Sequence, residues 1–316
     1  LFITFVFFSI YPPFKMEVVI LKQLEKIAVE QNRLLAELRD IMVNSEAVPP
    51  QIEPPRSAAL LIGLNYTDQK LCGPGVPELR GCVNDVHRMR DFLQGRLGFA
   101  QEDVVVLTDA PPQDGGVPPT ADGILQRIDE FVARATERGC SRLWFHFSGH
   151  GSFEIDYSGD ERDGRDECLI ASDGHAVSDD DLLSRLVLRA PVNAHLTCVM
   201  DCCHSGTQLD LKYRYIGGQR SAFINREFPV EEGKVCNVVC LSGCRDRGTS
   251  ADALLGKEWA GAMSSMLLRV LDEEGPNATC QDLLRKIRNF LREQSFEQVP
   301  QITSTFAIDH ESRFCC

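Results

Sequence analysis

A cysteine and a histidine each follow an apolar run in this sequence, and each is followed at once or soon by a glycine that lets the chain turn. Cys203 lies in the segment DCCHSG after the run from Leu196, and His150 lies in SGHG after the run from Leu143. A thiolate attacks an acyl carbon, and a nearby imidazole can take its proton and return it to the leaving amine. The pair therefore predicts a hydrolase with Cys203 as nucleophile and His150 as general base and acid.

The neighbours of these residues offer further chemistry and competing interpretations. The backbone amides of Gly151 and Cys203 are candidates to hold the oxyanion that forms during attack. Cys202 is a rival nucleophile, but adjacent residues of a strand point to opposite faces, so only one thiol can meet His150. His204 is a rival base that would need an unusual backbone to reach back. For either residue alone, a buried thiol or a structural histidine is the ordinary alternative.

From Ser57 onward the chain alternates between strand-like and helix-like patterns that could position these residues. We expect strands at 58–64, 103–108, 142–148, 167–172, 196–201, 237–242 and 302–308, and helices at 83–96, 121–138, 179–188, 258–274 and 280–294. Residues 210–234 show no clear period and predict an exposed loop. The alternation predicts an α/β fold, a mostly parallel sheet flanked by helices on both faces. Functional groups of such sheets gather beyond the carboxyl ends of the strands, where His150 and Cys203 fall.

The composition of the chain limits the kinds of partner it can bind and the cellular compartment it can occupy. The chain has 316 residues, a formal net charge of −13 and 13 cysteines. The charge argues against nucleic acid or an anionic membrane surface as a partner and suits cation sites. An odd number of cysteines without framework spacing indicates a reducing compartment, so we expect a cytoplasmic protein. The apolar run from Leu1 to Tyr11 is too short to span a bilayer, and we expect no stable membrane association.

The region before the alternating pattern divides into several segments. We interpret residues 1–15 as an extension from upstream translation, because Met16 offers a start; a truncated signal-type segment is the alternative. Residues 16–43 predict an amphipathic helix, residues 44–56 a proline-rich linker, and residues 57–316 the main domain. Apolar residues along the helix recur at spacings of four and three, which is a coiled-coil pattern. Weak self-association through this helix and a monomer with the helix packed on its own domain both fit the pattern.

The pairing of SGHG with DCCHSG, in this order and spacing, resembles the metacaspases, a family of caspase-like cysteine peptidases. The resemblance covers residues 57 to 310 and implies a caspase-like sheet, with the catalytic roles on His150 and Cys203. The short interruption after the cysteine motif and the N-terminal extension are similar to type I members. The extension lacks the zinc finger and the Gln/Pro-rich prodomain that some of those members carry.

Two aspartates suggest a pocket for a basic side chain. Asp201 stands two residues before Cys203 and so points to the same side of the strand, and Asp85 begins a helix after the first strand. If the two carboxylates converge, they would pair with the guanidinium or ammonium of a substrate and repel aspartate. Asp85 alone is also explained as a charge at a helix N-terminus. The metacaspase resemblance implies a pocket for Arg or Lys formed by Asp85 and Asp201 with Cys82 and Ser148.

Acidic residues crowd the segment from Glu154 to Asp181, and only Arg162 and Arg165 offset them. Such clusters suit Ca²⁺, a hard cation that takes six to eight oxygen ligands. The EF-hand spacing is absent, and a solvated acidic loop followed by a helix N-terminus explains the same residues. The family resemblance implies a Ca²⁺ site whose ligands are Asp166, Asp179, Asp180 and Asp210.

Together these observations predict a calcium-activated cysteine endopeptidase that cleaves protein or peptide substrates after Arg or Lys. Self-cleavage is expected at basic residues of exposed segments: Arg56, Lys212, Arg214, Arg220, Arg226 and Lys234. The alternative is a catalytically inactive caspase-like scaffold that binds calcium and acts through its N-terminal helix. A nucleotide-binding domain is excluded, because the chain has neither a GxGxxG nor a GxxxxGK segment.

Overall fold

The computed structural model describes residues 13–44, 55–110, 118–155, 165–202, 209–215, 223–231, 233–243, 252–255, 258–296, 298–309 and 311–315. Cys203, His204 and Arg220 lie outside these ranges. The chain divides into two units, Leu1–Pro54 and Pro55–Cys316.

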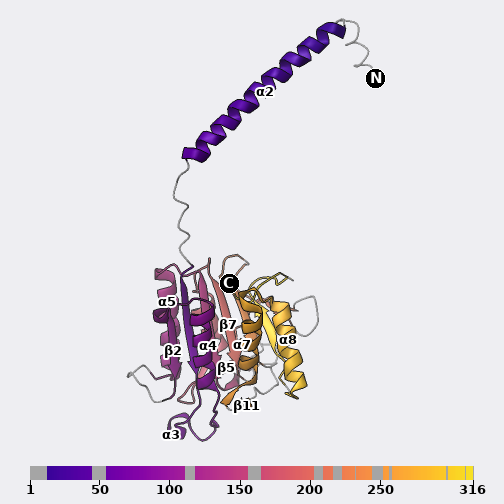
Figure 1. The fold of residues 1–316 in the computed structure, drawn as a ribbon. Helices are drawn as coiled ribbons and strands as arrows, with labels where there is room; N and C mark the ends of the chain where they lie inside the picture. The colour runs from indigo at the N-terminus through magenta and orange to yellow at the C-terminus, as the bar shows by residue number, and fades with distance from the viewer. Residues whose placement is uncertain are drawn as a thin grey trace. The chain divides into compact units, whose positions relative to one another are not determined.

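The first unit contains one helix, α2 (Pro13–Asn44), which is labelled in Figure 1. It covers the helix expected at 16–43 and begins three residues before Met16. Its described side chains, residues 21–39, are all exposed. Among the described residues, no helix combines the length and apolar character that crossing a bilayer requires.

The second unit is built on an eight-stranded sheet with the order β2-β1-β3-β7-β10-β13-β8-β9. The strands from β2 to β10 run parallel, and the remaining strands are antiparallel to their neighbours. The mostly parallel sheet expected from the alternating pattern is therefore confirmed. The strands are β1 (Ser57–Gly63), β2 (Val104–Thr108), β3 (Arg142–Ser148), β7 (His195–Asp201), β8 (Tyr213–Tyr215), β9 (Phe223–Ile224), β10 (Asn237–Ser242) and β13 (Gln301–Ser304).

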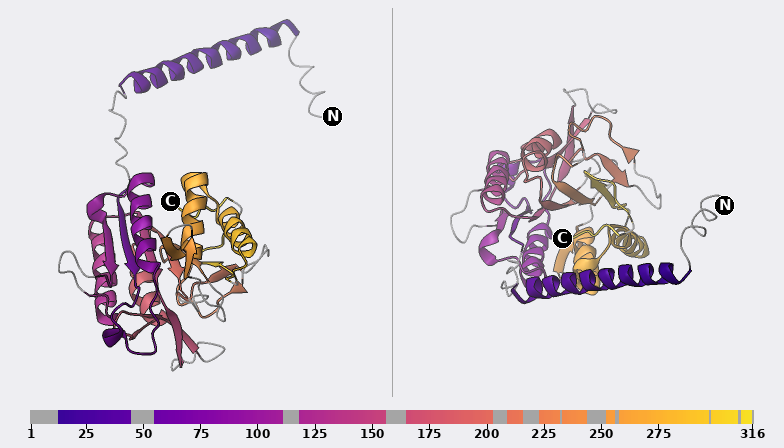
Figure 2. Two further views of the ribbon diagram at one scale, coloured as in Figure 1. Left: turned by 60° about the horizontal axis from the view of Figure 1, so that its bottom comes forward. Right: turned by 90° about the horizontal axis from the view of Figure 1, so that it is seen from above.

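Helices cover both faces of this sheet, and successive residues of β1 show how (Figure 2). Leu60 and Ile62 belong to the core shared with α5 (Ala121–Glu137) and with α6 (Asp179–Leu182), which continues as the short helix η2 (Leu183–Val187). Leu61, one position away, belongs to the opposite core. That core includes side chains of α4 (Cys82–Arg96), α7 (Ala262–Glu274) and α8 (Cys280–Glu293). Alternate side chains of a strand point to opposite faces, so one apolar strand supplies both cores. Short helices α3 (Gln69–Cys72), η1 (Gln101–Asp103) and η3 (Gly275–Asn277) complete the set.

Three sequence expectations need correction. The strand expected at 167–172 is β5 (Arg165–Ile170), which lies in a separate antiparallel sheet between β4 (Gly151–Ile155) and β6 (Ala176–Ser178). The start of the helix expected at 258–274 is instead β12 (Glu258–Gly261), paired with β11 (Asp252–Leu255). The segment 210–234 contributes β8, which pairs with β13, and β9, which pairs with β8, to the main sheet. Local patterns did not reveal these pairings, since each depends on a distant segment.

The order of the strands fixes where a site can form. The chain passes from β1 outward to β2 and then returns past β1 to β3, so the direction of travel reverses between β1 and β3. At such a reversal the loops after neighbouring strands diverge and leave a crevice at the carboxyl edge of the sheet. The residues that follow β1, β2, β3 and β7 are therefore the candidates for chemistry.

Candidate active site

His150 and the segment of the predicted nucleophile leave the sheet side by side. Ser148, the last residue of β3, pairs with Asp201, the last residue of β7, in parallel register. The backbone N–H of Gly149 donates to the carbonyl of Asp201 at 3.3 Å, which extends the contact past the strand ends. His150 follows Ser148 by two residues, as Cys203 follows Asp201. The register therefore brings the two chain segments to one edge of the sheet, although the Cys203 side chain lies outside the described residues.

The backbone of His150 is braced by the hydroxyl of Tyr66. The N–H of His150 donates to this hydroxyl at 2.8 Å, and the hydroxyl donates to the carbonyl of Ile170 at 2.7 Å. The N–H of Ile170 donates to the carbonyl of His150 at 3.0 Å. In an antiparallel ladder, a hydrogen-bonded pair exchanges two direct N–H···O bonds. Here the Tyr66 hydroxyl stands in the place of one of them and ties the start of β4 to the end of β5.

Tyr66 is itself held tightly. Its backbone has φ 56°, in the left-handed region that few side chains adopt. The carboxylate of Asp109, which follows β2, accepts the N–H of Tyr66 and, at 2.9 Å, the N–H of Asn65. A Cβ on Gly149 would lie 2.7 Å from the Tyr66 hydroxyl oxygen, so only glycine fits there. Burial raises the pKa of Tyr66 well above its ordinary value, which keeps the hydroxyl protonated as a donor.

The imidazole of His150 has a defined tautomer. Its Nε2 lies 2.8 Å from the carbonyl oxygen of Pro77. A carbonyl only accepts, so Nε2 must carry the proton and Nδ1 presents its lone pair. The ring of Tyr66 lies against the imidazole, with centroids 4.7 Å apart. His150 is only partly buried, so the ring remains accessible to a neighbouring thiol.

The register of β4 and β5 also orients the amide of Gly151. Gly151 stands opposite Leu169, next to the pair formed by His150 and Ile170. Hydrogen-bonded and non-hydrogen-bonded pairs alternate along an antiparallel ladder. The N–H of Gly151 therefore points away from β5.

The rival thiol of Cys202 is fully buried in the core that α5 covers.

The two predicted pocket aspartates converge on the opposite side of the sheet from Cys202. Asp85, in the first turn of α4, accepts the N–H of Gly261 at 2.9 Å and the hydroxyl of Ser148 at 3.0 Å. Asp201 accepts the N–H of Ser264, in α7, at 3.0 Å. A Cβ on Gly261 would lie 2.3 Å from an oxygen of Asp201 and 2.8 Å from one of Asp85. Both carboxyl groups therefore pack against one glycine at the end of β12.

Burial makes this pair of acids unusual. Asp85 and Asp201 have exposed fractions of 0% and 3%. Burial, and then the nearby carboxylate of Asp201, raise the pKa of Asp85 well above its ordinary value. Cys82, at the start of α4, and Ser148 are buried as well. Two neighbouring carboxylates in a medium of low polarity cannot both ionise cheaply unless a cation joins them.

A buried histidine lies beneath these acids. His146 precedes Ser148 by two residues on the same face of β3, and its Nε2 lies 3.4 Å from the hydroxyl of Ser264. Burial lowers the pKa of His146 to about 3, so its ring is neutral near pH 7. The pocket floor thus carries acids but no imidazolium from this residue.

The four residues that resemblance assigns to calcium fall on three segments. Asp166 lies in β5, where its backbone pairs with Glu154, and its side chain is outside the description. Asp179 opens α6 and is buried, and its carboxylate accepts the N–H groups of Glu167 and Asp180, each at 2.9 Å. Asp180 is exposed. Asp210 follows the nucleophile segment with φ 42°.

This donor set is chemically suited to a hard cation, since all the ligands are carboxylates. Asp179 and Glu167 are both buried, and the backbone N–H of Glu167, in β5, donates to the carboxylate of Asp179. Within the described residues, no three such side chains already form a metal cluster. Binding would therefore require Asp166 and Asp210 to join Asp179 and Asp180.

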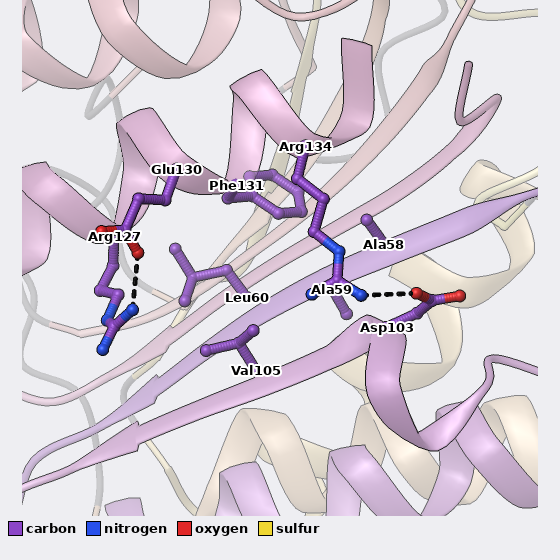
Figure 3. Close-up of a pocket in the computed structure, with 9 residues that line it drawn as sticks. All are labelled: Ala58, Ala59, Leu60, Asp103, Val105, Arg127, Glu130, Phe131 and Arg134. Carbon is purple, nitrogen blue, oxygen red and sulfur yellow. Dashed lines mark hydrogen bonds and ion pairs between the residues drawn. The ribbon is translucent and has the colours of Figure 1, made fainter. Parts of the chain in front are cut away.

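A small cavity of about 130 Å³ lies elsewhere, between α5 and the beginnings of β1 and β2 (Figure 3). Arg127 and Arg134 line it, but they pair with Glu130 and with Asp103. It lies at the amino ends of these strands, whereas His150 and the aspartates lie at the carboxyl edge. We assign it no part in the site.

Sequence reasoning missed Tyr66, Asp109, Pro77 and Gly261. A signal was present for two of them, because Tyr66 and Asp109 follow the carboxyl ends of β1 and β2, as His150 follows β3. Pro77 contributes its backbone carbonyl and Gly261 its backbone N–H and its lack of a Cβ. Neither contact is marked by a local sequence pattern.

The fold places the second unit among the caspase-like α/β proteins. It is similar to Caspase-1 from Spodoptera frugiperda, with a TM-score of 0.52 at 14% identity, covering 79% of this chain and 86% of that one. It is also similar to protein GSU0716 from Geobacter sulfurreducens, with a TM-score of 0.57 at 25% identity, covering 81% and 96%.

Sequence comparison defines the family. The family of the metacaspase, peptidase C14 domain, matches residues 57–212. Metacaspase-1 of Meyerozyma guilliermondii is 33% identical over 306 residues, which cover 82% of this chain and 72% of that protein. Metacaspase-1 of Yarrowia lipolytica is 34% identical over 304 residues, and the chain spans 64% of its length. The chain belongs to the metacaspase family, as the paired motifs predicted.

Proposed function

We propose that this protein is a cysteine endopeptidase in which Cys203 attacks the peptide carbonyl carbon and His150 moves the proton. The observation that carries the proposal is the register of Ser148 with Asp201, which sends both segments off the same edge of the sheet. Membership of a peptidase family supports it.

In this mechanism Nδ1 of His150 takes the proton of the Cys203 thiol, because Nε2–H is already bonded to Pro77. The thiolate sulfur then bonds to the carbonyl carbon, and the electron pair of the C=O bond moves to oxygen. The amides of Gly151 and Cys203 are the candidate donors to this oxyanion. Collapse breaks the C–N bond as Nδ1–H protonates the leaving amine. Water, deprotonated by Nδ1, then hydrolyses the thioester and regenerates the thiol.

We infer that the preferred substrates carry Arg or Lys at the cleaved position. The support is the buried pair of Asp85 and Asp201, which a guanidinium or ammonium would neutralise. An aspartate in this pocket would place a further acidic group beside them and bring no compensating positive charge. Since Gly261 packs against both acids, entry of a substrate side chain would require β12 to shift away from α4.

Calcium dependence is part of the proposal. Asp166, Asp179, Asp180 and Asp210 would hold Ca²⁺, and the ion would supply positive charge that holds these segments together. The structural support is the path from Asp179 to His150. Asp179 binds the backbone of Glu167 in β5, and the end of the same strand, Ile170, bonds to His150. A shift of β5 would therefore also displace the general base, His150.

Self-cleavage follows from the same specificity. Arg226 and Lys234 are exposed and lie outside strands, so they are suited to cleavage. Arg214 lies in β8, paired on both sides by β13 and β9, and is poorly suited. Lys212, Arg220 and Arg56 remain candidates.

The test is hydrolysis of matched fluorogenic peptides that end in Arg or in Asp, by the wild-type chain and by Cys203→Ala, with calcium and with chelator. We expect Arg-peptide hydrolysis that needs both Cys203 and calcium. Hydrolysis that persists in Cys203→Ala would assign the activity to a contaminant. Absence of any hydrolysis by pure wild type with calcium would instead favour a scaffold without catalysis.

A further inference from the structure

Helix α2 carries a stripe of apolar side chains that the peptidase proposal does not use. Leu24, Ile27, Leu34 and Leu38 are between 48% and 56% exposed. Burying such side chains stabilises an assembly by roughly 25 cal/mol per Å² of apolar surface removed from water. A long helix with this stripe is a surface that needs a partner.

The heptad register identifies the kind of partner. Leu24, Gln31 and Leu38 occupy one core position of the heptad, position a, and Ile20, Ile27, Leu34 and Ile41 occupy the other, position d. Leucine at a with isoleucine at d favours assemblies of three or four helices over dimers. The residues at positions a and d thus indicate that more than two copies of this helix associate in one bundle.

The stripe is also wider than a two-helix seam. Position e, next to d, carries Leu21, Ala28 and Leu35, and the two leucines are 58% and 60% exposed. A dimer buries chiefly a and d, whereas larger bundles also cover one flanking position. Val29, at position f on the far side, is the exception and is 69% exposed.

An acidic row and a basic row lie next to each other along one edge of the stripe. Glu30 and Glu37 occupy position g, and Lys26 and Arg33 occupy position c. Within one helix, Arg33 pairs with Glu30 at 3.2 Å and with Glu37 at 3.5 Å. In a parallel bundle with buried e positions, the g row of one helix lies beside the b row of the next, which carries Glu25, Asn32 and Arg39. An antiparallel arrangement would bring acidic g rows together.

Gln31 can fix how the helices of such a bundle align along their length. It is the single polar residue of the a and d positions between Ile20 and Ile41. A polar side chain at one a position costs stability but specifies alignment, because its hydrogen bonds are satisfied only when the copies are level. A helix that merely covered its own domain would gain nothing from this placement.

We propose that α2 is an assembly helix that joins more than two copies of this chain in one parallel bundle, which carries the peptidase domains at the ends of the 44–56 linkers. The proposal does not depend on peptidase activity.

The test is sedimentation equilibrium of the full chain with Cys203→Ala, which prevents self-cleavage from removing α2. We expect a mass of at least three times that of the 35.3 kDa chain. The double substitution Ile27→Ser with Leu34→Ser should give monomer, and the matched control Val29→Ser should keep the assembly. A monomer or dimer of the Cys203→Ala chain, or equal masses for the seam and control variants in that background, would overturn the proposal.

Discussion

The hydroxyl of Tyr66 stands between the backbone N–H of His150 and the carbonyl of Ile170, at 2.8 Å and 2.7 Å. A side chain that follows the first strand of the sheet therefore sets the position of the proposed general base, which follows the third. Neither residue signals this contact by itself.

Tyr66→Phe should lower kcat about tenfold while KM for an Arg-ended peptide changes little, because small displacements of a catalytic group are costly and the pocket is untouched. The matched control is Tyr215→Phe. It also removes a hydroxyl that accepts a backbone N–H, that of Ile308, but at β8. Equal losses of kcat in the two variants would show that Tyr66 matters only for stability.

Asp85→Asn should weaken binding of agmatine, a small guanidinium, by about 3 kcal/mol, or roughly two orders of magnitude in Kd. The pKa of Asp85 is raised, and a guanidinium favours its charged form, so binding releases a proton below that pKa. Wild-type affinity should therefore increase as pH rises and level off above the raised pKa. This dependence should vanish in Asp85→Asn and persist in Asp91→Asn, an exposed acid of the same helix. Pocket binding without any pH dependence would contradict the assignment.

Gly261→Ala should lower kcat/KM for Arg peptides and destabilise the fold by about 1–3 kcal/mol, because the added Cβ collides with both aspartates. Its backbone, with φ −64° and ψ 130°, tolerates alanine, so the loss reports the collision. Gly95→Ala, in α4 with open space around it, is the control and should stabilise slightly. The measurements are urea unfolding and peptide hydrolysis.

Asp179→Asn and Asp180→Asn should each raise the calcium concentration needed for half-maximal activity by tenfold or more, about 1.4 kcal/mol. Asp181→Asn, in the same acidic run but paired with Arg185, should leave it unchanged. Unaltered calcium response in all three variants would remove these residues from the metal site. Chelator should abolish wild-type activity, and added calcium should restore it.

Acid should destabilise the domain through His146. Its pKa is about 3 in the fold against 6.5 for an ordinary histidine, so the unfolded chain binds a proton that the folded chain excludes. Stability is therefore lost as pH falls below 6.5, by about 2 kcal/mol at pH 5. His146→Gln should flatten this slope in urea titrations, while His175→Gln, at an exposed position, should not. An unchanged slope would mean that other groups govern acid unfolding.

The sequence by itself determined the alternation of strands and helices and the presence of helices on both faces of the sheet. It also determined the two strand ends that carry His150 and Cys203. These features are local, because apolar periodicity and a residue's place after a strand can be read along the chain. The tertiary structure alone decided that the Tyr66 hydroxyl replaces a ladder bond, that Pro77 fixes the imidazole tautomer and that Asp85 meets Asp201 beneath Gly261. Each of these contacts joins segments that are far apart in the sequence. They depend on backbone atoms or on the register of neighbouring strands, and neither can be read from the order of residue types along the chain.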